Sequence, residues 1–283
     1  IHALRWNVAG RYVLLHYDLI ACYTNPELKL NDIWTFCGHL LEECRSVVVD
    51  IDDMSIASLP FYKFHNLGEN EEYRLESVRD AIDKNKGLVS VTEKLDGSFI
   101  QMRFITNNDV FDNGLLYSTS NTIACSANAG NNEHITALRK LHLNGSELEK
   151  HINLCASNPD KTFIFEFVHP EYDPHIVSYT PEREGLYLIG ARDVSTGILS
   201  SNESLDEIAA AYDIPRPRII AENLDEALEI QKSGDGSIME GMVANVGGWL
   251  IKIKLDSFLL LSQLYHKFDG AHGFKSICEA LYT

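Results

Sequence analysis

A lysine in a short polar turn is the residue of this chain best suited to covalent chemistry. Lys94 lies in Glu93-Lys94-Leu95-Asp96-Gly97-Ser98, where one predicted strand runs into the lysine and a second leaves from Phe99. Gly97 lets the backbone turn tightly and approach a ligand closely, and Asp96 can hydrogen-bond its own backbone and fix the turn. The amine is a nucleophile only when neutral, whereas an unperturbed lysine has a pKa of about 10.4. A hairpin turn with a solvated lysine is the alternative, and the pattern KxDG alone does not decide between the two.

Two further lysines, Lys252 and Lys254, stand two positions apart in a segment that alternates like a strand. Side chains at i and i+2 of a strand project to one face, so both ammonium groups point the same way. Such a pair can neutralise the phosphates of a nucleotide. An amphipathic strand that exposes both lysines to water and buries Ile251 and Ile253 fits the same alternation equally well.

Two glutamates stand in apolar surroundings. Glu166 lies within Phe163-Ile164-Phe165-Glu166-Phe167-Val168, and Glu240 lies within Met239-Glu240-Gly241-Met242-Val243. Burying a carboxylate without a partner is costly, so Glu166 lies on the open face of a half-buried strand or has a specific role. No glycine-rich phosphate loop of the pattern GxxxxGK[ST] or GxGxxG follows a strand, which excludes nucleotide binding through such a loop.

The predicted elements mix strands and helices without a regular alternation. Strands are predicted over 42–52, 88–104, 162–168 and 186–193, and a hairpin over 238–255 turns at Gly247-Gly248. Helices are predicted over 73–86 with a stop at Gly87, after capping boxes at Ser146/Glu149 and Ser204/Glu207, after Asn223, and over 256–282. This pattern favours an α+β fold over a doubly wound parallel sheet.

The order of these segments resembles the motifs of the covalent nucleotidyltransferases, the superfamily of ATP-dependent ligases and messenger-RNA capping enzymes. The matching segments are EKLDGS around Lys94, FIFEF around Glu166, GLYLI over 185–189, MEGMV around Glu240, and KIK over 252–254. Chance agreement of all five, in order and at suitable spacing, is far rarer than one match. The resemblance implies mostly antiparallel sheets flanked by helices, with an ATP cleft between them.

Two upstream segments are similar to the T4 RNA ligase 1-like family. They are Glu43-Cys44-Arg45 before a Val-rich strand, and the stretch from Ile56-Ala57-Ser58 through Lys63-Phe64-His65-Asn66-Leu67. The resemblance runs from about residue 40 to residue 258. It implies an adenylyltransferase domain over residues 1–258 and a C-terminal helical segment over 259–283, the start of the family's additional helical domain. Ser120 stands where the family pattern has a lysine, and His65 stands where it has another aromatic residue. These two departures leave the ATP affinity and the metal preference open.

The resemblance also implies a role for each residue. Lys94 is the nucleophile, and Lys252 and Lys254 are catalytic cations that neutralise the ATP phosphates and lower the pKa of Lys94. Glu166 bonds the ATP ribose, Glu240 positions the metal or the nucleophile, and both glutamates are candidate metal ligands. Arg45 and Lys63 bind phosphates of ATP or of the RNA 5′ end. The full ATP-binding set is Arg45, Lys63, Glu93, Lys94, Asp96, Gly97, Glu166, Glu240, Lys252 and Lys254.

The register of the predicted hairpin conflicts with these roles. A plain two-residue turn pairs Gly241 with Lys254 and puts Glu240 on the face opposite the lysines. If Glu240 and both lysines face one ATP site, the loop must be one residue longer or a bulge must intervene.

The implied function is an ATP-dependent RNA ligase that uses ATP with Mg²⁺ or Mn²⁺ and joins 5′-phosphate and 3′-hydroxyl RNA ends in RNA repair. An end-healing kinase or phosphatase is a further expected partner. Association with a membrane is not expected. The nearest alternative is a DNA ligase or a capping-type nucleotidyltransferase, both of which need a domain after the fifth motif. An inactive module that grips RNA ends is the alternative of a different class.

Composition sets limits on these predictions. The net charge of −17 over 283 residues argues against a non-specific nucleic-acid coat, but it permits an enzyme with a local basic site. The six cysteines form no CxxC or zinc pattern and indicate reduced thiols in a cytoplasmic protein. No apolar run approaches the length of a membrane span.

Overall fold

The structure is a computed structural model, and it describes residues 4–17, 42–87, 89–106, 108–125, 132–172 and 175–267. Cys22, Cys37, Cys278 and the predicted continuation of the last helix over 268–282 lie outside the described residues. No helix within these ranges is both long enough and apolar enough to cross a membrane.

The chain divides into two compact units, each built from three separate stretches. Unit 1 comprises Ile1–Lys63, Phe99–Phe165 and Leu188–Ile214, and unit 2 comprises Phe64–Ser98, Glu166–Tyr187 and Pro215–Thr283. The predicted boundary at residue 258 falls inside a helix that begins at Asp256, and the predicted division into 1–258 and 259–283 stays a prediction.

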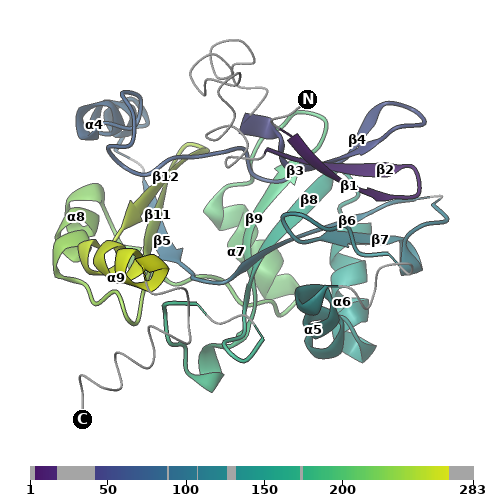
Figure 1. Cartoon of the computed structure of the whole chain (residues 1–283). Coiled ribbons are helices and arrows are strands. Elements are labelled where there is room, and N and C mark those ends of the chain that lie inside the picture. Colours follow the sequence, from purple (N-terminus) through teal and green to yellow (C-terminus); the bar gives the residue numbers. More distant parts are fainter. Residues whose placement is uncertain are drawn as a thin grey trace, which may run out of the picture. The chain divides into compact units, whose positions relative to one another are not determined.

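Unit 1 contains an antiparallel sheet of strand order β1-β2-β3-β4 (Figure 1). A second sheet, of order β7-β6-β8-β9, has most of its residues in this unit. Leu14 and Val48 of the first sheet pack with Leu116 and Ile123 in one buried cluster. The strands are β1 (Leu4–Ala9), β2 (Tyr12–Tyr17), β3 (Arg45–Asp50), β4 (Ser55–Ser58), β6 (Ser98–Phe104), β7 (Leu115–Ser118), β8 (Lys161–Val168) and β9 (Gly185–Asp193).

Three α-helices of unit 1 are described, together with one short 3₁₀ helix. They are α5 (Glu133–Leu141), α6 (Gly145–Ala156), α7 (Asn202–Ala211) and η1 (Asp112–Gly114). Buried leucines face the core from each α-helix: Leu138, Leu154 and Leu205. The amphipathic spacing of these residues explains why the segments are helical, because isolated helices of this length are marginal without packing.

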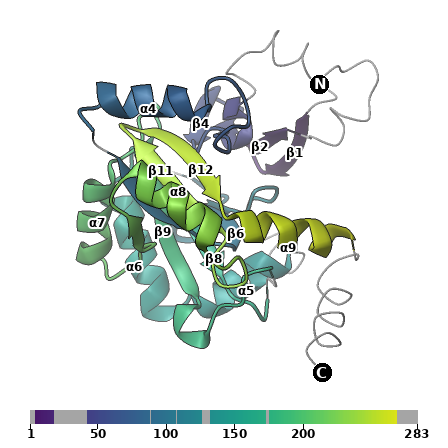
Figure 2. The same cartoon turned by 90° about the vertical axis from the view of Figure 1, so that its left-hand side faces the viewer.

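Unit 2 is built on an antiparallel sheet of order β10-β5-β11-β12. Helix α8 lies over β11 and β12 in Figure 2, and α9 follows directly after β12. The core of this unit includes Val91, Met242, Ile251 and Ile253, all fully buried. Its elements are α4 (Leu75–Lys84), β5 (Ser90–Lys94), η3 (Pro181–Arg183), β10 (Ile219–Ala221), α8 (Leu224–Ser233), β11 (Gly241–Val246), β12 (Trp249–Lys254) and α9 (Asp256–Lys267).

The α+β class with antiparallel sheets is confirmed, and every predicted strand segment contains strands. The helix over 73–86 is present as α4. Its last turn is followed by Lys86 and Gly87, both with positive φ. Asn223 caps α8, since its side chain accepts a hydrogen bond from the N–H of Glu226.

Both predicted capping boxes are wrong. Helix α6 begins at Gly145 after Asn144, so Ser146 is already inside the helix. Helix α7 begins at Asn202, and the side chain of Ser201 accepts from the N–H of Ser204. The N-cap residues are Asn144 and Ser201, two and three positions before the predicted serines.

Candidate active site

The sheet of unit 2 brings Lys94 and Lys254 to one face. Gly241 of β11 lies opposite Lys94 of β5 on one side and opposite Lys254 of β12 on the other. Directly opposed residues of antiparallel strands project to the same face, so the two lysines flank a glycine that has no side chain. Lys252 lies two residues earlier on β12, on the same face, opposite Val243. The predicted common face of Lys252 and Lys254 is therefore present.

Glu240 lies between the two lysines and bonds both. Its Oε2 is 2.5 Å from Nζ of Lys94, and its Oε1 is 2.8 Å from Nζ of Lys254. The side chain of Glu240 is 5% exposed, against 22% for Lys94 and 27% for Lys254. Burial alone would raise the pKa of Glu240, but the two ammonium groups lower it below its ordinary value. Glu240 is thus a buried carboxylate kept ionised by two cations.

The register argument against this convergence is wrong. The hairpin has a regular two-residue turn at Gly247-Gly248, and β11 and β12 pair without a bulge. Glu240 nevertheless reaches Lys254, as well as Lys94, from its position just before Gly241, the first residue of β11, which has a φ of 155°. A Cβ on Gly241 would lie 2.3 Å from the carbonyl oxygen of Ile253. The alternation rule assumes regular backbone, and it fails at the one residue where only glycine fits.

Lys94 is charged in this arrangement. Burial lowers the pKa of Lys94, but the carboxylates of Glu240, Glu166 and Asp96 raise it by more, and the net pKa lies above the ordinary lysine value. The sequence predicted the opposite, namely that Lys252 and Lys254 would lower it. The prediction fails because Glu240 stands between Lys254 and Lys94 and its negative charge is closer to the amine.

Gly97 and Glu166 meet in the turn that follows Lys94. The N–H of Gly97 donates to Oε1 of Glu166 at 3.2 Å. A Cβ on Gly97 would lie 2.4 Å from the carbonyl oxygen of Phe167, so the turn can approach β8 only because this residue is glycine. Burial raises the pKa of Glu166 to about 7, with Lys94 opposing the shift and Glu240 adding to it. Strands β5 and β6 also belong to different sheets, which excludes a simple hairpin around Lys94.

Glu93 projects away from Lys94, as adjacent residues of a strand do. Its side chain is fully buried, and its Oε2 accepts from Arg183 at 2.8 Å and from Arg218 at 2.9 Å. The structure therefore does not bring the Glu93 carboxylate together with Lys94 and Glu240. No sequence pattern pointed to Arg183 or Arg218, because ion pairs between distant segments leave no local signal.

Arg45 and Lys63, the predicted phosphate-binding residues, both belong to unit 1. Arg45 begins β3, and the N–H of Lys63 donates to the carbonyl of Glu42 at 2.9 Å, so the two segments lie side by side. The Nζ of Lys63 lies 5.8 Å from the ring centroid of Tyr17.

The two departures from the family pattern lie in different units. Ser120 is in unit 1 beside β3, and its carbonyl accepts from Oγ of Ser46 at 2.7 Å. His65 is in unit 2, where its carbonyl accepts from the N–H of Lys252.

A buried arginine, Arg192, contacts both the segment before Arg45 and the segment before Lys63. Arg192 of β9 makes a two-pronged ion pair with Glu43, at 2.6 and 2.8 Å, and donates to the carbonyl of Pro60 at 2.9 Å. Its guanidinium also lies 5.6 Å from the ring centroid of Tyr62. Arg192 thereby contacts the residues just before Arg45 and just before Lys63. The sequence did not indicate this role.

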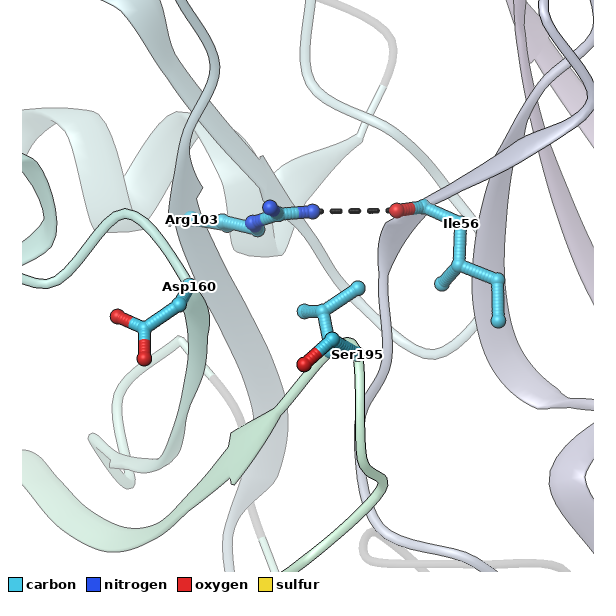
Figure 3. Close-up of a pocket in the computed structure, with 5 residues that line it drawn as sticks. Ile56, Arg103, Asp160 and Ser195 are labelled. Atoms are coloured by element: carbon cyan, nitrogen blue, oxygen red, sulfur yellow. Dashed lines mark hydrogen bonds between the residues drawn. The ribbon is translucent and has the colours of Figure 1, made fainter.

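Unit 1 also carries a surface hollow of about 390 Å³, shown in Figure 3. It is lined by Ile56, Arg103, Asp160, Val194 and Ser195. The guanidinium of Arg103 donates to three backbone carbonyls, those of Ile56, Ala57 and Pro159, at 2.9–3.1 Å. The arginine is thus used to hold β4 and the loop before β8, and none of the predicted catalytic residues lines this hollow.

Within the described ranges, no group of three or more His, Cys, Asp or Glu side chains is arranged to hold a metal ion. The predicted metal ligands are Glu166 and Glu240, and Glu240 is already bonded to Lys94 and Lys254. A divalent cation at this site would therefore take most of its ligands from phosphate oxygens and water.

A central strand that ends in a lysine bonded to a buried glutamate, with further lysines on the same face, is the arrangement expected of a covalent nucleotidyltransferase. Within that class, the sequence model of the family described as RNA ligase matches residues 43–260, and the chain belongs to this family. The predicted family is therefore confirmed.

Similar proteins agree with this assignment. A protein of Thermovibrio ammonificans named as an RNA ligase is 27% identical over 235 residues, covering 80% of this chain and 53% of its own. Two structures of an archaeal ATP-dependent RNA ligase share the fold, with TM-scores of 0.58 and 0.54 at 15% identity. They cover 96% and 81% of this chain, and 64% and 57% of the archaeal chain. The chain thus spans between about half and two thirds of the length of these relatives.

Proposed function

We propose that this protein is an ATP-dependent RNA ligase whose nucleophile is Lys94. The observation that carries the proposal is the position of the Lys94 amine, which lies at the end of a central strand in contact with Glu240 and on one face with Lys254. The family assignment and the ATP-dependent archaeal relative support ATP as the co-substrate. The roles of the individual residues and the RNA-repair role are parts of this proposal.

The first step makes the covalent intermediate. After Lys94 loses a proton to solvent, Nζ attacks the α-phosphorus of ATP, an N–P bond forms, and the bond to the pyrophosphate oxygen breaks. Lys254 and Lys252 place positive charge on the face where the phosphates are handled, which favours the developing charge of the leaving group. Mg²⁺ or Mn²⁺, when bound, would supply further charge neutralisation, with Glu166 and Glu240 as the carboxylates able to orient its water ligands.

The next two steps join the RNA ends. A 5′-phosphate oxygen of RNA attacks the phosphorus of lysine–AMP, the N–P bond breaks, and Lys94 regains its proton. The 3′-hydroxyl of a second RNA end then loses its proton to solvent, its oxygen forms a bond to the 5′-phosphorus, and the phosphoanhydride bond to AMP breaks so that AMP leaves. Arg45 and Lys63 of unit 1 are the proposed contacts for phosphates of ATP or of the RNA 5′ end. An end-healing kinase or phosphatase as partner, and a cytoplasmic location, remain predictions from the sequence.

Intact-mass spectrometry after incubation with ATP and Mg²⁺ tests this function. The protein should gain one AMP, mapped to Lys94, and Lys94→Arg should abolish the gain because the guanidinium stays charged and cannot attack. Lys161→Arg on β8 is a matched control with an unrelated lysine and should adenylylate normally. An adduct that survives in Lys94→Arg would refute the assignment of Lys94 as the nucleophile.

The RNA substrate is tested separately, by comparing the sealing of RNA ends with the sealing of DNA ends. Equal sealing of the two would refute the RNA substrate.

A further inference from the structure

One short segment of unit 2 contacts the chain on both sides of Lys94. On the far side, Oδ2 of Asp96 accepts from the backbone N–H groups of Ile176 and Val177, at 3.1 and 3.0 Å. In return, the hydroxyl oxygen of Tyr179 accepts from the N–H of Asp96 at 2.7 Å. Asp96 is therefore held through both its side chain and its backbone, and every one of these bonds goes to residues 176–179.

The same segment reaches the near side through Arg183. The guanidinium of Arg183 donates to Oε2 of Glu93 at 2.8 Å, and it lies 5.4 Å from the ring centroid of Tyr179. Glu93 directly precedes Lys94 and Asp96 follows it by two positions, so residues 176–183 bond the Glu93 side chain on one side of Lys94 and the side chain and backbone N–H of Asp96 on the other. Tyr179 takes part in both sets of contacts, since its hydroxyl accepts from the N–H of Asp96 and its ring packs against the guanidinium of Arg183.

The hydroxyl of Tyr179 is suited to this role because it is neutral and half-buried. Burial raises the pKa of Tyr179 well above the ordinary tyrosine value, so the oxygen accepts from the amide of Asp96 without carrying a charge. A buried backbone N–H that is satisfied by a side chain keeps one conformation of the turn, whereas a solvated N–H does not. In-line attack requires the reacting atoms at about 3–3.5 Å, and a misplacement of about 1 Å can cost roughly 100-fold in rate.

We propose that Tyr179 is a positioning residue for the nucleophile: its hydroxyl fixes the Asp96 amide and with it the direction in which Lys94 presents its amine. The inference rests on the proposed function, since it assumes that Lys94 attacks ATP. It goes beyond that function by assigning a role to a residue that contacts the turn and not the amine itself.

Single-turnover adenylylation of the purified full chain with Tyr179→Phe tests the inference. The maximal rate of lysine–AMP formation at saturating ATP should fall about 10- to 100-fold, while the ATP concentration for half-maximal rate changes less than about threefold. Tyr187→Phe is the matched control. Its hydroxyl donates to the carbonyl of Arg183 at 3.0 Å in the same half-buried region and does not hydrogen-bond to residues 93–97. This control should adenylylate within about twofold of the wild type.

The possible outcomes separate the two proposals. A wild-type chain that gains no AMP refutes the proposed function and this inference together. A wild type that gains AMP with an equally fast Tyr179→Phe variant refutes the inference alone. Equal losses in Tyr179→Phe and Tyr187→Phe also refute it, because they would indicate a general loosening of residues 176–183. Loss of a single hydroxyl bond removes only a small part of a protein's stability, so circular dichroism should show both variants folded at 25 °C.

Discussion

At the scale of the single residue, the charge state of Lys94 decides when chemistry can start. Its amine is bonded to Glu240 and its pKa is raised, so most molecules carry the charged, unreactive form near neutral pH. Cations that arrive with ATP act in the opposite direction, because positive charge near an amine lowers its pKa. If Lys94 is the nucleophile, as proposed, the ion pair keeps its amine charged until ATP and a metal ion change the local charge.

The rate of lysine–AMP formation should rise with pH because of this restraint. Only the neutral amine attacks, and its fraction grows about tenfold per pH unit as long as the pH is below the pKa. Pre-steady-state adenylylation from pH 6 to 9 should show this rise without an early plateau. In Glu240→Gln the profile should move to lower pH, because a carboxylate that raises the pKa is gone. A profile that is flat between pH 6 and 8 would contradict the assigned charge state.

Glu166 should make stability depend on pH in a defined window. Its folded pKa is about 7, above the ordinary value of 4.5, so the folded state retains a proton that the unfolded chain releases between these values. The stabilisation is fully present below about pH 4.5 and is lost as the pH rises through about 7. The melting temperature of Glu166→Gln minus that of the wild type should therefore increase from pH 5 to pH 8. A difference that shrinks over this range would show that Glu166 is ionised and well paired.

At the scale of the element, the sequence predicted the strands and the shared face of Lys252 and Lys254. Period-2 alternation is set by local backbone geometry, so it is visible in the chain itself. The pairing of Glu93 with Arg183 and of Arg192 with Glu43 joins segments far apart in sequence, and nothing local encodes it. Gly241 shows a further limit, since its single unusual φ reversed the predicted face of Glu240.

Arg192 should be a main support of unit 1. Its side chain is 7% exposed, and its removal leaves Glu43 and the Pro60 carbonyl without their donor. Arg192→Met should lower the free energy of unfolding by roughly 2–4 kcal/mol, measured by urea denaturation. Lys232→Met is the control, because its ion pair with Glu229 is mostly exposed and contributes under about 0.5 kcal/mol. An Arg192→Met chain as stable as this control would refute the supporting role.

At the scale of the whole molecule, the net charge of −17 limits how the proposed RNA substrate could be held. Each phosphate neutralised by a cationic side chain adds about 0.7 to the salt slope of binding to a single strand. If Arg45, Lys63 and the β12 lysines are the main contacts, the slope of log K against log salt should be about −2 to −3. Fluorescence anisotropy with a 5′-phosphorylated RNA between 50 and 300 mM KCl measures it. A slope steeper than about −6 would instead indicate an extended basic surface.

Because β5 lies between β10 and β11, its amide protons exchange with water only when the sheet itself opens. The amide protons of the strand that carries Lys94 should therefore be among the slowest of unit 2 to exchange. Lys254, by contrast, lies at the end of β12, which follows β11 in the sheet order. Under the proposed function, ATP would enter by displacing side chains at this face, above all by separating Glu240 from one or both of the ammonium groups it bonds. The paired backbone beneath the Lys94 amine would stay unchanged from one turnover to the next.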